Sequence, residues 1–394
     1  MKPLPIKKNF FTLGVIVLAV LAINGLAFLA IRFYSGLGAV TNLDNQTPWG
    51  LWIGVDVAAG VALAAGGFTS AALAHVFHRE SYHAIVRPAL LTAMLGYTFV
   101  AFAVCIDIGR FYYIWHPLIM WNGNSALFEV GICVMIYMSV LYIEFLPIVT
   151  ERFIGKVNLP GALAAFNKPV DALLRLLDSG LSKTMFVFII AGVVLSTLHQ
   201  SSLGTLMVIA GQKMHPLWQT PVLPLLFLLS AIAVGFPMII FESLLASRSF
   251  KLKPEMNLLT NLGSMTVPLL GIYLAFKIGD MFIRETFVYT ARFDYTAFMF
   301  LSEIGLLLVA FLMLLSRKTL GSPGMLFTAA SLVIAGVLLN RFNNFITAYK
   351  PFYDTVTYYP SVGEISVTIG CIALLVLIYR FIVIYFPVIS HEKK

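Results

Sequence analysis

Long apolar stretches alternate with short polar segments along the chain. Ten of these stretches are mostly apolar over 20 residues or more: 11–33, 50–74, 88–109, 125–147, 183–202, 222–246, 261–283, 296–315, 324–343 and 363–386. A helix needs about 20 such residues to cross the hydrocarbon core of a bilayer. The first stretch lacks the small-residue cleavage site of a secretory signal, so we expect it to be retained. The pattern predicts an all-α integral membrane protein with about ten transmembrane helices.

The composition agrees with a chain that lies mostly in lipid. Of the 394 residues, 60% are hydrophobic and 11% are charged, and the mean hydropathy is +0.91. A soluble domain carries roughly 25% charged residues, so this chain has too little polar material to cover a surface in water. A soluble enzyme, a disordered protein and a nucleic-acid-binding domain are thereby excluded.

The basic residues predict the orientation. Seventeen of the 26 Lys and Arg residues lie on the side of the N-terminus, and seven, among them Arg32 and Arg341, lie on the other side. Basic residues concentrate in cytoplasmic loops, so we expect both termini in the cytoplasm. In a bacterium the chain then lies in the inner membrane, with the other face towards the periplasm.

The longest cytoplasmic segment, residues 148–182, is too short for a second domain. Asn167-Lys168-Pro169 resembles a helix start and Gly180 a stop. The segment is either a short helix in the membrane interface or an ordinary amphipathic linker.

Several predicted transmembrane helices carry ionisable residues, which are functional candidates by default because charge is costly in lipid. Those in the outer half are Asp56, Asp107, Glu129, Asp280 and Glu303, and those near the inner ends are Glu144 and Glu242. Some have a structural alternative: Asp107 and Arg110, or Lys277 and Asp280, are spaced as local ion pairs. Asp56 and Glu129 lack such a partner and are the stronger candidates.

The histidines and cysteines do not predict a redox centre. His75, His78 and His83 group at the inner edge, where we expect interface residues and no metal. The three cysteines, Cys105, Cys133 and Cys371, stand alone in apolar runs and form no CxxC pair, so we expect neither an iron–sulfur cluster nor a zinc site. We therefore expect no haem, no iron–sulfur cluster and no metal in this chain.

Two polar runs near the outer edge can bind a ligand. The first is residues 198–204, in which His199, Gln200 and Ser202 can donate hydrogen bonds to the carbonyls of a buried polar molecule. The second is residues 46–52, in which Trp49 can form the wall of a flat aromatic pocket. The alternatives are a polar helix cap for the first run and an interfacial anchor for the second.

From the residues alone, three functions remain: a transporter, a quinone-handling subunit of an electron-transfer complex, and a structural anchor. Five acids in the outer half argue against a pure anchor. A proton- or ion-coupled secondary transporter remains the alternative, because Pro237 and Pro268 can break helices at comparable depth.

Short motifs add a family resemblance. They are Pro48-Trp49-Gly50 with Asp56, Arg87-Pro88, Asp107-Ile108-Gly109-Arg110, Leu127-Phe128-Glu129 and the run 199–204. In this order they resemble the polysulfide-reductase-type (NrfD-like) membrane subunits. Residues 215–219, Pro224-Leu225 and Phe241-Glu242 look more narrowly like the Hyb-type membrane subunit of periplasmic uptake [NiFe]-hydrogenases.

The resemblance implies a single membrane domain without redox centres of its own. Two four-helix bundles, about 50–202 and about 222–343, would form its core, with helices 11–33 and 363–386 outside it. The chain would bind menaquinone or ubiquinone near the periplasmic edge. A periplasmic, ferredoxin-like iron–sulfur subunit would dock there, and the large and small subunits of a [NiFe]-hydrogenase would supply the electrons.

A mechanism follows as a hypothesis. His199, Gln200, Ser202, Trp49 and Arg110 would bind the quinone. Asp107, Asp56 and Glu129 would relay protons, which would enter from the cytoplasm past Glu144 and Glu242. Protons from that side would make turnover electrogenic.

Overall fold

A computed structural model describes residues 3–6, 8–77, 79, 82–353 and 357–390. In this part of the chain, ten helical segments are long and apolar enough to cross a membrane, which confirms the predicted class and number. They are α1 (Leu13–Ser35), the segment Trp52–His75, α4 (His83–Asp107), α5 (Ala126–Phe153), α6 (Asn167–Ala210), α7 (Leu223–Phe250), α8 (Met256–Ile283), α9 (Tyr295–Leu314), the segment Pro323–Thr347 and α12 (Val362–Tyr385).

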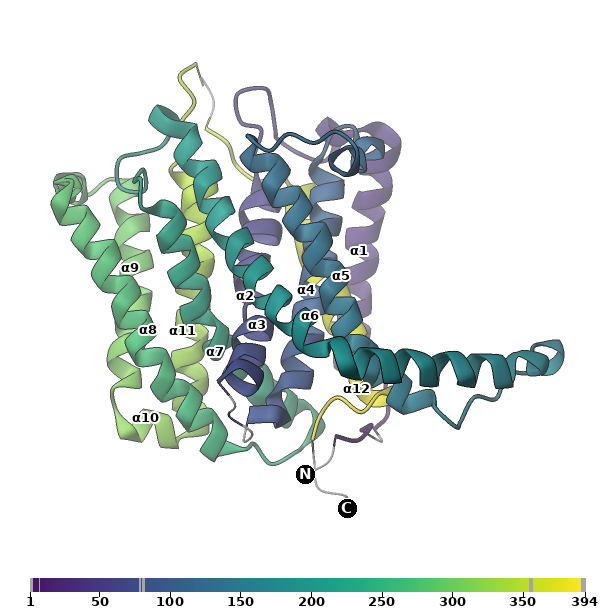
Figure 1. The fold of residues 1–394 in the computed structure, drawn as a ribbon. Coiled ribbons are helices and arrows are strands. Elements are labelled where there is room, and N and C mark those ends of the chain that lie inside the picture. Colours follow the sequence, from purple (N-terminus) through teal and green to yellow (C-terminus); the bar gives the residue numbers. More distant parts are fainter. Residues whose placement is uncertain (1–2, 7, 78, 80–81, 354–356, 391–394) are drawn as a thin grey trace.

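The helices pack in two groups (Figure 1). The first bundle consists of the segment Trp52–His75, α4, α5 and α6, and the second consists of α7, α8, α9 and α11 (Pro323–Phe342). Helix α7 joins the two groups, since it also packs against α6 and the segment Trp52–His75. Helices α1 and α12 pack against each other and flank the first bundle. Both described chain ends lie on one side of the molecule, here called the termini side; the opposite side is called the far side.

Helix α6 is longer than the sequence pattern predicts. It runs without interruption for 44 residues, so the predicted stop at Gly180 and the predicted end at residue 202 are both wrong. Its first part extends sideways from the bundle on the termini side, across the direction of the other helices (Figure 1). An exposed glycine costs a helix only about 1 kcal/mol, which the regular helix on either side of Gly180 offsets.

The run 198–204 is therefore inside α6 and is not a helix cap. Two hydroxyls of the run and one directly after it bond to carbonyls of their own helix: Ser201 and Ser202 donate to Thr197 and Leu198, and Thr205 donates to Ser201. Such bonds satisfy polar side chains within a helix in lipid. The helix thus continues through a sequence that looks like its end.

Two segments depart from α-helical geometry. The second membrane segment begins with the π-helix η2 (Trp52–Ala59) and continues through α2 (Gly60–Leu63), α3 (Gly66–Ala71) and η3 (Ala72–Val76). Helix α11 continues into the π-helix η10 (Asn343–Thr347), which packs against η2. π-Helical turns are rare, and those that occur often lie at functional sites. By contrast, α7 and α8 are continuous through Pro237 and Pro268, so the broken helices expected of a transporter are not formed there.

Helices α1 and α12 approach closely at a pair of glycines. A Cβ on Gly370 would lie 2.7 Å from the Cα of Gly25, and one on Gly25 would lie 2.8 Å from the Cα of Gly370. Small residues at such positions allow two membrane helices to pack backbone to backbone. Helix α12 begins with a capping box, in which the Ser361 hydroxyl accepts from the amide of Glu364 at 3.0 Å.

Candidate functional site

The interior of the first bundle contains a buried histidine. His199 of α6 is 0% exposed, and its Nδ1 lies 3.3 Å from the hydroxyl of Tyr97 in α4. The ring of Tyr97 meets that of Tyr137 in α5 edge to face, with 4.5 Å between the centroids. The Nε2 atom of His199 has no hydrogen-bond partner in the described part of the chain. A buried polar atom without a partner is costly, so this nitrogen can receive a ligand or a water molecule.

A carboxylate lies beyond this histidine, closer to the far side of the molecule. The Ser202 hydroxyl, one turn further along α6, donates to Oε1 of Glu129 at 2.6 Å. Glu129 lies in the first turn of α5 and is exposed, whereas Ser202 is buried. The pair therefore links the surface at the far-side end of the bundle to its interior.

Gln200 faces a different neighbour from His199. It is 0% exposed, and its Nε2 donates to the carbonyl of Val61 in the second membrane segment at 2.9 Å. Its Oε1 has no partner among the described residues. The run 198–204 thus directs two unsatisfied polar atoms, His199 Nε2 and Gln200 Oε1, into the bundle.

Helix α5 carries polar residues along one face, from the far side to the termini side. Glu129, Cys133, Tyr137 and Glu144 are spaced by four, four and seven residues, which places them on one face of a helix. No described residue hydrogen-bonds to the side chain of Glu144, which lies against Gly192 of α6. This face of α5, Tyr97 of α4 and His199 of α6 together form a polar line through the first bundle.

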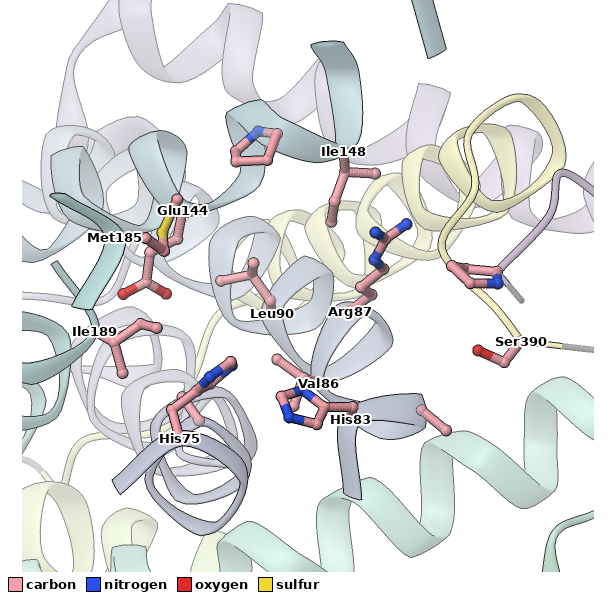
Figure 2. Close-up of a pocket in the computed structure, with 14 residues that line it drawn as sticks. His75, His83, Val86, Arg87, Leu90, Glu144, Ile148, Met185, Ile189 and Ser390 are labelled. Carbon is pink, nitrogen blue, oxygen red and sulfur yellow. The ribbon is translucent and has the colours of Figure 1, made fainter. Parts of the chain in front are cut away.

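The termini-side end of the polar line opens into a cavity of about 590 Å³. Figure 2 shows the carboxyl of Glu144 and the rings of His75 and His83 around this cavity, with Arg87 towards Ser390. The two histidine rings touch edge to face at 4.8 Å between centroids. Arg87 is held by Glu151 at 2.7 Å and by the carbonyl of Pro387 at 2.9 Å. His78, expected in the same group, lies outside the described residues.

Glu242, the other acid predicted near the inner ends, lies apart from the lining of this cavity. It belongs to α7, and its Oε1 accepts a hydrogen bond from the hydroxyl of Tyr379 in α12 at 2.7 Å. Glu242 therefore joins the second bundle to α12, whereas Glu144 faces the first bundle.

The structure places Asp56 and Asp107 towards α12. Asp56, in η2, accepts from the Thr368 hydroxyl at 2.7 Å. Asp107 ends α4, where Arg32 of α1 donates to the carbonyls of Ile106 and Ile108 at 2.6 and 2.7 Å. The charged groups that act on Asp107 are Glu364 of α12 and Arg32 of α1. These two acids thus lie at the junction with the flanking helices, while Glu129 lies between α5 and α6.

Two predicted local ion pairs are wrong. Arg110 is exposed, and no ion pair joins it to Asp107 in the described part of the chain. Lys277 pairs with Glu303 of α9 at 3.3 Å, and Asp280 pairs with Arg284 at 2.7 Å. Lys277 finds its partner on a neighbouring helix, whereas Asp280 finds its partner one turn further along its own chain.

Trp49 lies at the boundary between the two bundles. It is half-buried, and its ring contacts Phe345 of η10 and Tyr349 at centroid distances of 6.2 and 5.7 Å. The ring of Trp49 therefore lies between the start of η2 and η10.

The sequence reasoning missed Tyr97 and Tyr137 because tyrosines are common in membrane proteins and carry no charge at neutral pH. It also missed Arg32, which it counted in an outer loop although the side chain is 2% exposed. Glu364 was overlooked because it stands in the first turn of a helix, where acids are expected as caps. A signal existed for the tyrosines: Tyr137 follows Glu129 by eight residues and precedes Glu144 by seven.

The described residues contain no group of three or more His, Cys, Asp or Glu side chains arranged to hold a metal ion. Their chemistry is that of hydrogen bonding and proton transfer: imidazole, phenol, hydroxyl and carboxyl groups within reach of one another.

Comparisons with known proteins agree with this description. The chain is 35% identical to a protein of Nitratidesulfovibrio vulgaris over 98% of this chain and 96% of that protein. It is 32% identical to the probable Ni/Fe-hydrogenase 2 b-type cytochrome subunit of Escherichia coli, over 100% of this chain and 96% of that protein. It is 27% identical to the integral membrane subunit of menaquinone reductase of N. vulgaris, over 91% of this chain and 87% of that protein.

The family model for polysulphide reductase, NrfD, matches residues 39–351. This range contains both bundles and leaves out the flanking helices α1 and α12. The long match and the full-length relatives lead to one conclusion: the chain belongs to the polysulphide reductase NrfD family of multi-pass membrane proteins.

Proposed function

We propose that the chain is the quinone-reactive membrane subunit of a respiratory oxidoreductase complex. One relative is named a probable b-type cytochrome subunit of a Ni/Fe-hydrogenase and another the integral membrane subunit of menaquinone reductase, which supports a redox complex and a quinone. The observation that carries the proposal is the polar line, which joins a cavity on one side of the membrane to a carboxylate at the other. Quinone reduction consumes two electrons and two protons, so a quinone site needs such a supply of protons.

The quinone head group, of menaquinone or ubiquinone, would bind between α5 and α6 at the far-side half of the first bundle. His199 Nε2 is unsatisfied, and Glu129 is exposed at the edge where a lipid-soluble ring can enter. His199 would hydrogen-bond one quinone oxygen. Ser202 holds Glu129 at 2.6 Å and would position it as the proton donor for the other.

Protons would enter through the termini-side cavity. The proposed order is Glu144, Tyr137, Tyr97 and then His199, with bound water completing the gaps. Each group can accept and donate a proton through its hydroxyl, carboxyl or ring nitrogen. Asp56, Asp107 and Glu242 remain further relay candidates, and Gln200, Trp49 and Arg110 remain candidates for quinone binding.

A haem is not part of this proposal, although the E. coli relative is named a b-type cytochrome subunit. A haem between helices needs axial ligands on opposite faces of its ring. His75 and His83 touch each other at 4.8 Å, which leaves no room for a macrocycle between them, and His199 is engaged with Tyr97. These three histidines therefore do not fit a haem held by two histidines.

The far side would face the periplasm of a bacterium and dock the electron-transferring partners. We place both termini in the cytoplasm because basic residues concentrate on their side. A ferredoxin-like iron–sulfur subunit would then sit above the quinone site, and a [NiFe]-hydrogenase pair is the catalytic partner that the E. coli relative's name supports.

The test is Glu129→Gln in the complex purified with its partner subunits. This change keeps the size and hydrogen bonding of the side chain but removes its exchangeable proton. We expect normal assembly, normal electron delivery to an artificial acceptor at the partner subunit, and quinone-linked turnover slowed by about 100-fold. Glu285→Gln, in an exposed loop on the far side, is the matched control. Wild-type quinone turnover in the Glu129 variant would exclude Glu129 as the donor.

A further inference from the structure

The first part of α6 has no role in the proposed quinone reaction. Residues 167–182, here called the arm, extend sideways from the first bundle on the termini side, across the direction of the membrane-spanning helices (Figure 1). A helix in this direction does not cross the bilayer. It lies in water, along the membrane surface or against another protein, and these three surroundings require different side chains.

Apolar side chains gather on one face of the arm. Val170, Leu173 and Leu177 recur at the three- and four-residue spacing that places side chains on one side of a helix. Leu173 is 54% exposed, and Leu176, at the edge of this face, is 70% exposed. Large exposed leucines are unfavourable in water. The apolar face of the arm therefore requires an apolar cover, which the described residues do not supply.

The opposite face of the arm is polar and is covered by the chain itself. The Asp171 carboxylate accepts from the Gly155 amide at 2.6 Å and from the Arg175 guanidinium at 2.8 Å. Gly155 belongs to the loop between α5 and α6, which Figure 1 shows on the side of the arm that faces away from the membrane-spanning helices. Asp171 and Arg175 each stand two residues from Leu173, which is about 200° around a helix. The apolar face is therefore turned towards the bilayer.

The apolar face continues the lipid-exposed surface of the same helix. Beyond the arm, where α6 enters the bundle, Val187 and Val194 are 64% and 49% exposed. Apolar side chains exposed on a membrane-spanning helix contact lipid tails, which are as apolar as leucine. The bilayer thus already reaches the base of the arm, and acyl chains are the apolar medium closest to Leu173 and Leu176.

Two lysines flank the apolar face. Lys168 and Lys183 are exposed and stand 15 residues apart, about four turns, so they project from the same side of the arm. No described carboxylate lies within ion-pair distance of either lysine. A lysine can lay its apolar stem along an apolar surface while its ammonium group reaches polar surroundings. Lysines beside exposed leucines are typical of helices that lie in a membrane interface.

We propose that the arm is an interfacial helix that binds phospholipids of the termini-side leaflet. Leu173 and Leu176 insert among the acyl chains, and Lys168 and Lys183 contact the lipid phosphates. The polar face with Asp171 stays in water under the loop from α5. Lipid is favoured over a second protein as the occupant because the exposed leucines continue a surface of α6 that the bilayer already covers.

The arm then sets the depth of the termini-side cavity in the membrane. Asp178 of the arm accepts from the Thr150 hydroxyl of α5 at 3.1 Å, which ties the arm to α5. Met185 and Ile189, which follow the arm on α6, line the cavity. The mouth of the cavity therefore lies in the head-group layer, where water is present. The use of this cavity for proton entry rests on the proposed function, whereas the position of the arm does not.

Nitroxide labels on opposite faces of the arm test this position. Leu173→Cys and Ser182→Cys stand nine residues apart, which places the two labels half a turn from each other. The purified chain, with its associated subunits, is returned to phospholipid nanodiscs, and collisions of each label with oxygen and with a water-soluble nickel chelate are measured. We expect the label at Leu173 to lie about 5–10 Å below the phosphates and to collide mainly with oxygen. The label at Ser182 should collide mainly with the chelate. Wild-type protein labelled in parallel gives the background from the native cysteines, Cys105, Cys133 and Cys371.

Two results would overturn the proposal. Frequent collisions of the Leu173 label with the chelate would place the apolar face in water. Protection of this label from both oxygen and the chelate would place another protein over it. Leu176→Cys repeats the measurement if Leu173→Cys does not fold, and its label should lie in the same range of depth. A complex without quinone activity would defeat the proposed function instead, and the labels would still report where the arm lies.

Discussion

At the residue scale, we expect the proposed quinone site to depend most on His199. It is fully buried, has one near neighbour in Tyr97, and has one ring nitrogen without a partner. We expect His199→Ala to weaken binding of a quinone-site inhibitor by about tenfold, which is the loss of one buried hydrogen bond. Inhibitor titration of purified wild-type and variant complexes measures this.

The matched control for His199 is His116→Ala, in the half-buried loop on the far side of α4. It removes an imidazole outside the polar line and should leave inhibitor affinity unchanged. Equal affinity in the wild type and His199→Ala would remove this histidine from the site.

His215, in the loop between α6 and α7, predicts a pH dependence. Burial, with the nearby charges of Lys350 and Arg292, lowers the pKa of this histidine to about 4. An unfolded histidine has a pKa of about 6.5, so below that pH the unfolded chain binds a proton that the folded chain does not. Folding stability should therefore decrease as the pH falls from about 6.5 towards 4.

The variant His215→Asn isolates this contribution. Asparagine keeps an acceptor where Nδ1 of His215 accepts from the amide of Leu217 at 3.3 Å, but it does not titrate. Thermal unfolding midpoints at pH 7 and pH 5 should differ less in the variant than in the wild type. An identical difference in both proteins would assign the acid sensitivity to other groups.

At the element scale, the contact of α1 with α12 depends on two glycines. Any Cβ at Gly370 meets the backbone of Gly25, and backbone cannot move aside as a side chain can. We expect Gly370→Val to separate the helices and to lower stability by about 1–3 kcal/mol. A cysteine pair placed across α1 and α12 would report the separation as a loss of cross-linking.

Gly324 is the control for Gly370, because a Cβ there meets nothing within 4 Å. Gly324→Val should leave the α1–α12 cross-link and the unfolding midpoint close to wild type. Efficient cross-linking in Gly370→Val would mean that the pair tolerates a wider spacing.

The elements also show which helix ends a sequence can predict. Two helices that a side chain caps, α9 with Asp294 and α12 with Ser361, begin within a residue of the predicted position. The ends of α6 were missed because hydroxyl groups bonded to their own backbone replace the expected cap, and because Gly180 alone does not stop a helix. Local composition predicts a helix end only where the polar side chains have no hydrogen-bond partner within the helix itself.

At the scale of the whole molecule, the buried arginines sharpen the prediction of orientation. Arg32 and Arg341 were counted on the outer side, but they are 2% and 0% exposed and bonded inside the protein. The rule counts basic residues in loops, and these two lie inside α1 and α11, so the outer count falls from seven to five. A periplasmic reporter fused after Lys394 should be silent, and one inserted after Gly123 should be active. The opposite result would invert the protein in the membrane.

The sequence by itself determined that the chain is a multi-pass membrane protein of ten helices, because apolar length is a local property that needs no knowledge of neighbours. Its motifs also pointed to the family. The sequence further marked the acids as costly in lipid. It did not determine their partners: Glu303 meets Lys277 and Asn340, and Asp56 meets Thr368, only once distant helices pack.

The tertiary structure decided the site because hydrogen bonds between side chains depend on which helix faces are apposed. Tyr97 and His199 are about 100 residues apart in sequence, yet they lie 3.3 Å apart between α4 and α6. Spacing along a single helix cannot reveal such a contact, since many helix pairings are compatible with the same apolar pattern. The packing of the ten helices selects one of these pairings. That pairing creates the polar line through the first bundle and the ion pair of Lys277 with Glu303 in the second.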